Sequence, residues 1–191
     1  MRKTFKFLAI ILGGLLIGGG AGVWHIRSGG FGDTPIGPWL YSRLAGSTAA
    51  DDTTRSVIAL FGLLALPRAE ALYFTAKSDS AGRPLDGRCH YRIDGAPLSA
   101  RWWSITLYNP DGYLIPNQWH RHSIGSLRAA TGADGRWQAH IAPSPADDVT
   151  IPTATRGAFD ITLRAYRPSG QLLADPRQVQ LPTITRLECG Q

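Results

Sequence analysis

The segment "RWWSITLY", residues 101–108, alternates apolar and polar side chains. One side of the extended chain carries Trp103, Ile105 and Leu107. The opposite side carries Trp102, Ser104, Thr106 and Tyr108. A period of two is typical of an antiparallel strand with one buried and one hydrated face. We therefore predict that Trp103 lies in the core and that Trp102 lies on the surface with Tyr108.

The same alternation recurs in "CHYRI" (89–93), "WQAHI" (137–141) and "FDITLRAY" (159–166), with turn-forming sequences between them. Short alternating strands predict an all-β fold, an antiparallel β-sandwich or jelly-roll-like domain. Residues 143–157 are the longest irregular stretch and are expected to form a rim loop. We expect further side chains to join the polar face of Trp102, namely Glu70, His90, Arg92, Arg164 and Tyr166.

A helix is expected before these strands, over residues 53–61. Asp51 or Asp52 can cap its N-terminus and Gly62 can end it. No later stretch has a convincing helical period. We divide the chain into an N-terminal segment (1–27), a linker with this capping helix (28–66) and a β-sandwich domain (67–191).

The formal net charge of +6 is concentrated at the N-terminus. After Arg27, 16 basic and 14 acidic side chains leave a net charge of +2 without a basic cluster. This distribution argues against a nucleic-acid-binding protein.

Residues 7–24, "FLAIILGGLLIGGGAGVW", form an uncharged run preceded by Arg2, Lys3 and Lys6. The run has the length of a single transmembrane helix, and the preceding cations predict a cytoplasmic start. A cleaved signal peptide is the alternative. Both place the rest of the chain in the periplasm, and we favour an uncleaved anchor in the bacterial inner membrane.

Gly14, Gly18 and Gly22 recur at every fourth residue of this run. Small residues at that spacing let two membrane helices pair closely, which predicts a homodimer. A glycine-rich anchor that falls into this spacing by chance is the alternative.

Cys89 and Cys189 are the two cysteines of the chain. In an oxidising compartment we expect them to form a structural disulfide that ties the C-terminus to an early strand.

Taken in order, several segments resemble a bacterial family, the domain of unknown function numbered 1214. They are "IGPW" (36–39), "EALYFTA" (70–76), "GRPLDG" (82–87), "RWWSITLY" (101–108), "LIPN" (114–117), "RHSI" (121–124), "FDITLRAY" (159–166) and "LPTITR" (181–186). The resemblance implies an all-β, jelly-roll-like domain, here in a stand-alone form behind a membrane anchor. It implies no settled activity.

The chain departs from that family at two places. His122 stands where members usually have Tyr, and residues 149–152 replace a segment that is often Asn-Trp-Leu-Pro. If the second segment serves a ligand in the family, the role is altered in this chain.

Four side chains are our candidates for a ligand-binding surface, namely Trp102, Tyr108, Arg121 and Arg164. Arginine binds carboxylate or phosphate with two parallel hydrogen bonds, and the aromatic rings can stack on a sugar or another flat ligand. The alternatives are structural ion pairs for the arginines and ordinary packing for the rings. The ligand is a small molecule or an envelope partner, and no cofactor is implied.

The rival hypothesis is an exported hydrolase, metal-assisted or acid–base, that uses His90, His120 and His122. In a strand, His120 and His122 would point to the same side. The sequence has no Gly-x-Ser-x-Gly element for a serine hydrolase. It also has no evident partner for Glu70 in a glycosidase-like carboxylate pair, so Glu70 is expected to cap local backbone or to pair with an arginine.

Overall fold

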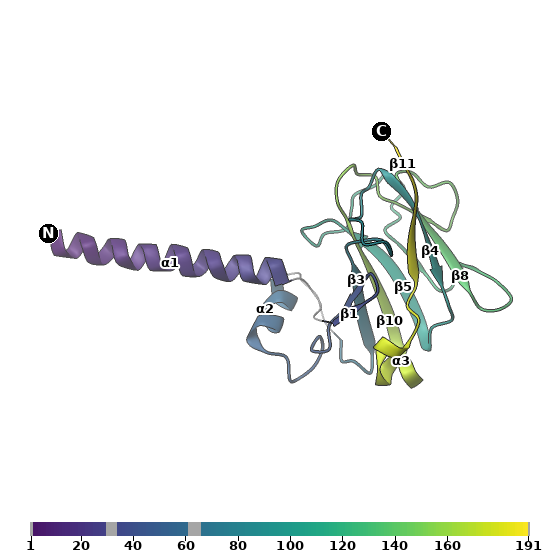
Figure 1. Ribbon diagram of the computed structural model, residues 1–191, viewed down its shortest axis with the longest axis horizontal. Helices are drawn as coiled ribbons and strands as arrows, with labels where there is room; N and C mark the ends of the chain where they lie inside the picture. Colours follow the sequence, from purple (N-terminus) through teal and green to yellow (C-terminus); the bar gives the residue numbers. More distant parts are fainter. Residues whose placement is uncertain (1, 30–33, 61–65, 191) are drawn as a thin grey trace.

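The computed structural model describes residues 2–29, 34–60 and 66–190. Its main body is a sandwich of two mostly antiparallel sheets. Helix α1 (Arg2–Gly29) projects away from this body, and the short α2 (Asp52–Leu60) lies between them (Figure 1). The predicted sandwich is therefore confirmed.

One sheet has six strands in the spatial order β1-β2-β3-β10-β5-β6. The bounds of its strands are β1 Thr34–Ile36, β2 Trp39–Tyr41, β3 Ala71–Ala76, β10 Asp160–Pro168, β5 Ala100–Tyr108 and β6 Ser123–Gly125. The segment expected as part of a linker thus supplies β1 and β2, which extend the sheet beyond β3.

The other sheet has the order β11-β4-β8-β7, and β9 pairs with β8 in parallel. The bounds of its strands are β11 Thr183–Cys189, β4 Cys89–Gly95, β8 Trp137–Ala142, β7 Ala130–Thr131 and β9 Thr150–Pro152. Strand β9 lies inside residues 143–157, so this stretch is less irregular than predicted.

Two stacked tryptophans pack the inner sides of the two sheets against each other. Trp103 on β5 stacks on Trp137 on β8 with ring centroids 3.9 Å apart. Gly95 on β4 lies directly opposite Trp137, and a Cβ added there would meet the indole at 2.1 Å. The residues predicted to face inward on β4, β5, β8 and β10 are buried, because their alternation matches the pleat of the strands.

The helix predictions are partly confirmed. The carboxylate of Asp51 accepts a hydrogen bond from the backbone N–H of Thr54 at 2.8 Å, so Asp51 caps α2. The predicted stop at Gly62 lies outside the described residues. A third helix, α3 (Gly170–Ala174), follows β10 and buries Leu172, and a 3₁₀ turn (Pro176–Gln178) comes next. The expectation of no helix after residue 68 was wrong because one turn is too short to show a period.

Helix α1 covers the segment predicted as a membrane anchor. In the part of the chain that the structure describes, no helix has the length and apolar character needed to span a membrane. The large apolar side chains described along α1 are exposed, with Phe7 and Trp24 near its two ends.

The predicted disulfide is present. Cys89 at the start of β4 is bonded to Cys189 at the end of β11, across 100 positions of sequence. It ties the last strand to the sandwich, as expected, and indicates an oxidising compartment outside the cytoplasm.

The loop between β3 and β4 covers the free edge of β11. Ser80 donates its backbone N–H to the carbonyl of Ile184 at 2.9 Å, and its hydroxyl accepts the N–H of Ile184 at 2.8 Å. The loop is held by Asp79, which is 1% exposed and accepts hydrogen bonds from Ala81 and Arg83. Burial alone would raise the pKa of Asp79, but these hydrogen bonds outweigh it and lower the pKa.

Candidate ligand-binding face

The outer side of the six-stranded sheet carries a cluster of aromatic and arginine side chains. Strand pairing places Trp102 opposite Tyr166, and it places Arg164 between Tyr73 and Ser104. We call the cluster the aromatic–arginine face and define it by Tyr73, Trp102, Tyr108, Arg164 and Tyr166. This sheet lies on the side of the sandwich from which α1 projects (Figure 1).

Trp102 is a surface residue, as predicted. It is 36% exposed, whereas its neighbour Trp103 is 5% exposed. Its ring lies 5.0 Å from the ring of Tyr166, measured between centroids. A Cβ added at Gly125 would lie 2.7 Å from the indole, so only glycine lets the ring lie this close to β6. Trp102 is therefore positioned by two neighbours and remains open to solvent.

Arg164 is half-buried between two tyrosines. Its Nη2 donates a hydrogen bond to the Tyr108 hydroxyl at 2.7 Å. Its guanidinium carbon lies 5.3 Å from the ring centroid of Tyr108 and 5.9 Å from that of Tyr73. Both contacts are within cation–π range.

Arg164 and Tyr108 must lean towards each other to make this contact. Arg164 is opposite Ser104, and Tyr108 lies four residues further along β5, about 14 Å at the rise of a strand. The two side chains therefore meet above the intervening pair, Thr106 and Thr162.

A row of hydroxyl side chains lies beneath this bridge. Thr75, Thr162 and Thr106 are aligned across β3, β10 and β5. All three are buried, and so is Ser104. The sequence predicted Ser104 and Thr106 on a hydrated face. They do lie on the outward side of their strand, but both are buried.

Asp160 lies at the start of β10, directly opposite Tyr108 on β5. Its carboxylate is 3.8 Å from the ammonium of Lys77. Burial raises the pKa of Asp160, and the charge of Lys77 partly opposes this effect. The face therefore has an ion pair at its Asp160 end and an aromatic pair at its Trp102 end.

Arg121 does not belong to this cluster. It precedes β6 and binds the segment before β9, where its guanidinium donates to the carbonyls of Asp147 and Thr150 and to the Asp148 carboxylate. This is the structural alternative considered for the arginines. Its proposed role in ligand binding is not tested by these contacts, which are all made within the chain.

The three candidate histidines lie in different places. His90 is on β4, in the five-stranded sheet, whereas His120 and His122 precede β6 in the six-stranded sheet. Neither of the latter two is in a strand, and His120 has a positive φ of 50°, so the expected same-side arrangement is absent. Within the described ranges, no three His, Cys, Asp or Glu side chains are grouped to hold a metal ion.

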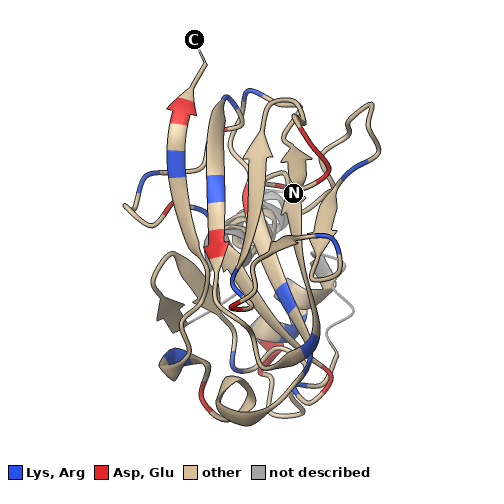
Figure 2. Ribbon diagram, turned by 90° about the vertical axis from the view of Figure 1, so that its right-hand side faces the viewer, with Lys and Arg blue, Asp and Glu red and all other residues tan. Residues whose placement is uncertain are grey.

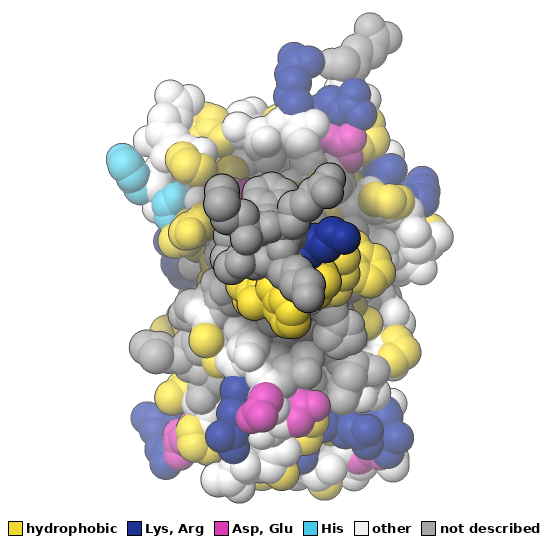
Figure 3. Space-filling view, turned by 90° about the vertical axis from the view of Figure 1, so that its left-hand side faces the viewer, with side chains coloured by type: hydrophobic (Ala, Val, Ile, Leu, Met, Phe, Trp, Pro, Cys, Tyr) yellow, Lys and Arg dark blue, Asp and Glu magenta, His cyan; other side chains and the backbone are white. Residues whose placement is uncertain are grey.

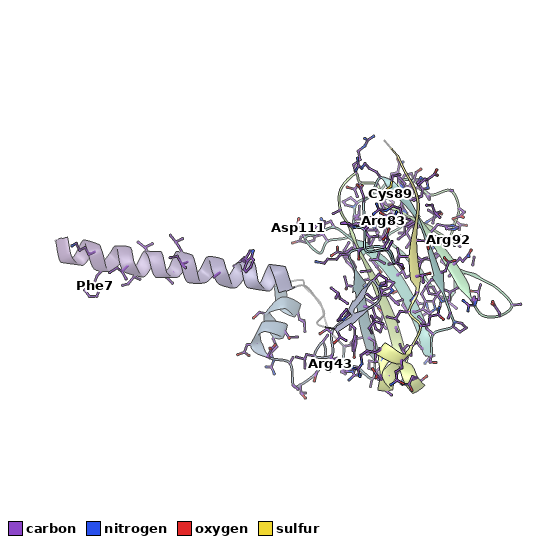
Figure 4. The ribbon with its side chains drawn as sticks, in the orientation of Figure 1. Phe7, Arg43, Arg83, Cys89, Arg92 and Asp111 are labelled. Carbon is purple, nitrogen blue, oxygen red and sulfur yellow. A yellow bond between two sulfur atoms is a disulfide. The ribbon has the colours of Figure 1, made fainter. Side chains whose placement is uncertain are left out.

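On the outer side of the five-stranded sheet, polar side chains are hydrogen-bonded to one another. Arg92 donates to Asp94 on the same strand at 2.8 Å, and Gln138 donates to the other oxygen of Asp94. Arg92 lies on the opposite side of the molecule from Asp111, which is at the tip of the loop after β5 (Figure 4). Strands β4 and β11 of this sheet each carry a basic and an acidic position (Figure 2). Two residues expected near Trp102, His90 and Arg92, are therefore on the wrong sheet for that role.

Sequence reasoning missed three residues of the site. Asp160 lies on the outward side of the alternating segment 159–166, so a signal was present, whereas the mostly apolar residues 71–76 gave no such signal for Tyr73. The role of Gly125 depends on which strand passes Trp102, and that pairing is not visible in one sequence. Glu70 was also expected on this face. Its carboxylate lies 3.8 Å from Arg167, so it pairs with an arginine as predicted.

A family comparison covers the whole aromatic–arginine face. Residues 70–170, more than half of the chain, match the family described as "Protein of unknown function (DUF1214)". The chain belongs to this family. The resemblance noted in the sequence is thereby confirmed for the domain. A search of curated proteins gave no match.

Two solved structures are similar to the chain. The VPA0106 protein from Vibrio parahaemolyticus has 22% sequence identity and a TM-score of 0.60, over 92% of this chain and 44% of that protein. A putative uncharacterized protein from Burkholderia cenocepacia has 14% identity and a TM-score of 0.48, over 89% of this chain and 41% of that one. The first likeness supports the sandwich fold. The chain spans less than half the length of these two proteins.

Proposed function

We propose that this DUF1214 protein is a ligand-binding module of the bacterial periplasm that works through the aromatic–arginine face and performs no catalysis. One observation carries the proposal. A solvent-exposed tryptophan and a half-buried arginine stand on the same outer sheet face, and the arginine lacks a carboxylate partner among the described residues. Exposed aromatic rings and unpaired charged donors are typical of binding surfaces.

We also propose that residues 7–24 hold the module at the inner membrane and that Gly14, Gly18 and Gly22 pair two copies. The exposed apolar side chains of α1 support this, because water solvates such a surface poorly. Figure 3 looks along α1 and shows hydrophobic side chains gathered where the helix points to the viewer. Alkaline extraction of cell membranes provides the test. We expect the chain to stay in the membrane fraction with Met1 present, and its complete release would exclude the attachment.

Native mass spectrometry of the exported protein tests the binding function. We expect the wild-type chain to carry a co-purifying mass that Trp102→Ala with Arg164→Met removes. Arg92→Met is the matched control, because Arg92 is also half-buried on a strand but faces the other side. A mass that survives the double substitution, or that the control also removes, contradicts the proposal.

A further inference from the structure

We propose that the ligand is an acidic saccharide, with a carboxylate bound by Arg164 and a sugar ring stacked on Trp102 and Tyr166. This inference rests on the proposed binding function and adds the chemical class of the ligand.

The first argument is the distribution of ion pairs. Eight arginines after residue 27 lie within 4.0 Å of a carboxylate oxygen, namely Arg83, Arg88, Arg92, Arg121, Arg136, Arg167, Arg177 and Arg186. The other arginines are exposed, except Arg68 and Arg164. Arg68 donates to the carbonyl of Leu173 at 3.1 Å, whereas Arg164 donates to a phenol.

A partly buried cation is unfavourable unless it is paired. The Tyr108 hydroxyl and two ring faces compensate for part of this cost at Arg164, but a neutral phenol takes one of five guanidinium N–H groups. A planar carboxylate fits the remaining donors, and charge-assisted bonds of this kind are stronger than neutral ones. The chemistry of Arg164 therefore favours an anionic group.

The second argument is the aromatic pair. Trp102 and Tyr166 form a tilted pair on the same sheet face, and the glycine at position 125 keeps the indole close to the strands. An amphipathic ring held this way offers a broad apolar surface with polar edges. The C–H face of a pyranose ring matches such a surface.

The third argument is the spacing between the two subsites. Trp102 and Tyr166 lie two residues further along β10 than Arg164, about 7 Å at the rise of a strand. The guanidinium leans the other way, towards Tyr108. The anion and the stacked ring therefore need a ligand longer than one sugar unit. The aromatic pair lies on the Trp102 side of Arg164, so the ligand extends from Arg164 towards Trp102.

Calorimetry with two acidic trisaccharides, trigalacturonate and trimannuronate, tests the inference on the full disulfide-bonded chain. The methyl ester of each probe keeps the rings but removes the carboxylate charge. We expect at least one acid to bind the wild-type chain, and its ester to bind roughly tenfold more weakly or worse, since one charge-assisted contact is lost. Equal binding of acid and ester, or failure of both acids to bind at millimolar concentration, overturns the inference.

Variants separate the two subsites. Arg164→Met is expected to weaken the acid to the level of its ester and to leave the ester unchanged, with Arg164→Lys between the two. Trp102→Ala is expected to weaken acid and ester alike, and Arg92→Met neither. A retained thermal transition confirms that each variant folds. If Arg164→Met binds the acid as wild type does, the inference is wrong.

The two proposals fail in distinguishable ways. If a native mass is lost on the double substitution but neither uronate binds, the binding function stands and the saccharide assignment falls. If no mass co-purifies and no uronate binds, both fall.

Discussion

The outer sides of the two sheets each carry an arginine, and the two arginines have different partners. On the five-stranded sheet, Arg92 is paired with Asp94, and Asp94 also accepts from Gln138. On the six-stranded sheet, Arg164 lies between two tyrosines and has no carboxylate within ion-pair distance in the described part of the chain. The first arrangement is complete within the molecule, and the second leaves donors for something else. This difference is the reason why we propose recognition on the six-stranded sheet and structural support on the five-stranded sheet.

The largest loss of stability is expected when the disulfide of the five-stranded sheet is removed. Replacing Cys89 and Cys189 by Ala should lower the free energy of unfolding by about 2–5 kcal/mol, since a long loop in the unfolded chain is no longer closed. Urea unfolding of the oxidised wild type and the variant measures the change. Reduction of the wild type should reproduce it, and an unchanged midpoint would show that the bond supports nothing.

A matched pair of glycines compares the two sheets directly. Gly95→Ala places a methyl group 2.1 Å from the buried indole of Trp137, which is also stacked on Trp103. The ring has no room to move, so we expect a loss at the upper end of the roughly 1–3 kcal/mol that overpacking costs. Thermal and urea unfolding measure it. A variant as stable as wild type would contradict the packing described for this sheet.

The loop that covers β11 should depend on the charge of Asp79. Asp79→Asn should cost about 1–3 kcal/mol at neutral pH, because a buried charged acceptor is lost. The pKa of Asp79 is lowered from its ordinary value of 3.8, so its contribution is complete above that pH and is lost as pH falls through the lower, folded pKa. Urea unfolding between neutral pH and strong acid should give a flatter pH profile for the variant. The exposed Asp134→Asn serves as control and should keep the wild-type profile.

The smallest effect is expected at the second glycine. Gly125→Ala meets the indole of Trp102 at 2.7 Å, but this ring is partly exposed and can swing outward. We expect a change below about 1 kcal/mol in stability, as is usual at a surface site, together with greater acrylamide quenching of tryptophan emission. If Gly125→Ala destabilises as much as Gly95→Ala, the six-stranded face is packed as firmly as the core and offers no adaptable site.

Alternation was enough to orient most strands from the sequence. Trp103, Ile105 and Leu107 are buried and Trp102 is not, because the pleat admits no other assignment once one side is apolar. The pairing of strands was not accessible in the same way. His90 and Arg92 alternate as well as Arg164 and Tyr166 do, yet they belong to the other sheet. Alternation within one segment therefore predicts which sheet side a side chain faces, but it does not predict which strands lie next to that segment.

The sequence predicts the site residues to the same extent as it predicts the strands: it gives their side but not their partners. Trp102, Tyr108 and Arg164 were selected because each stands on an outward position, and the structure brings these three to one face. Arg121 was selected by residue type, and its partners lie 26 to 29 positions away in the sequence. No local pattern reports contacts of that range, so the structural use of Arg121 could be seen only in three dimensions.

The hydrogen bonds between Ser80 and Ile184 affect how readily these molecules aggregate through an edge strand. A bare outermost strand is a template onto which a strand from another molecule can be added, and that growth has no natural end. Here a piece of the same chain already occupies part of that template, and a covalent bond fixes the far end of the strand. The protein thereby hinders the addition of a foreign strand at the start of β11.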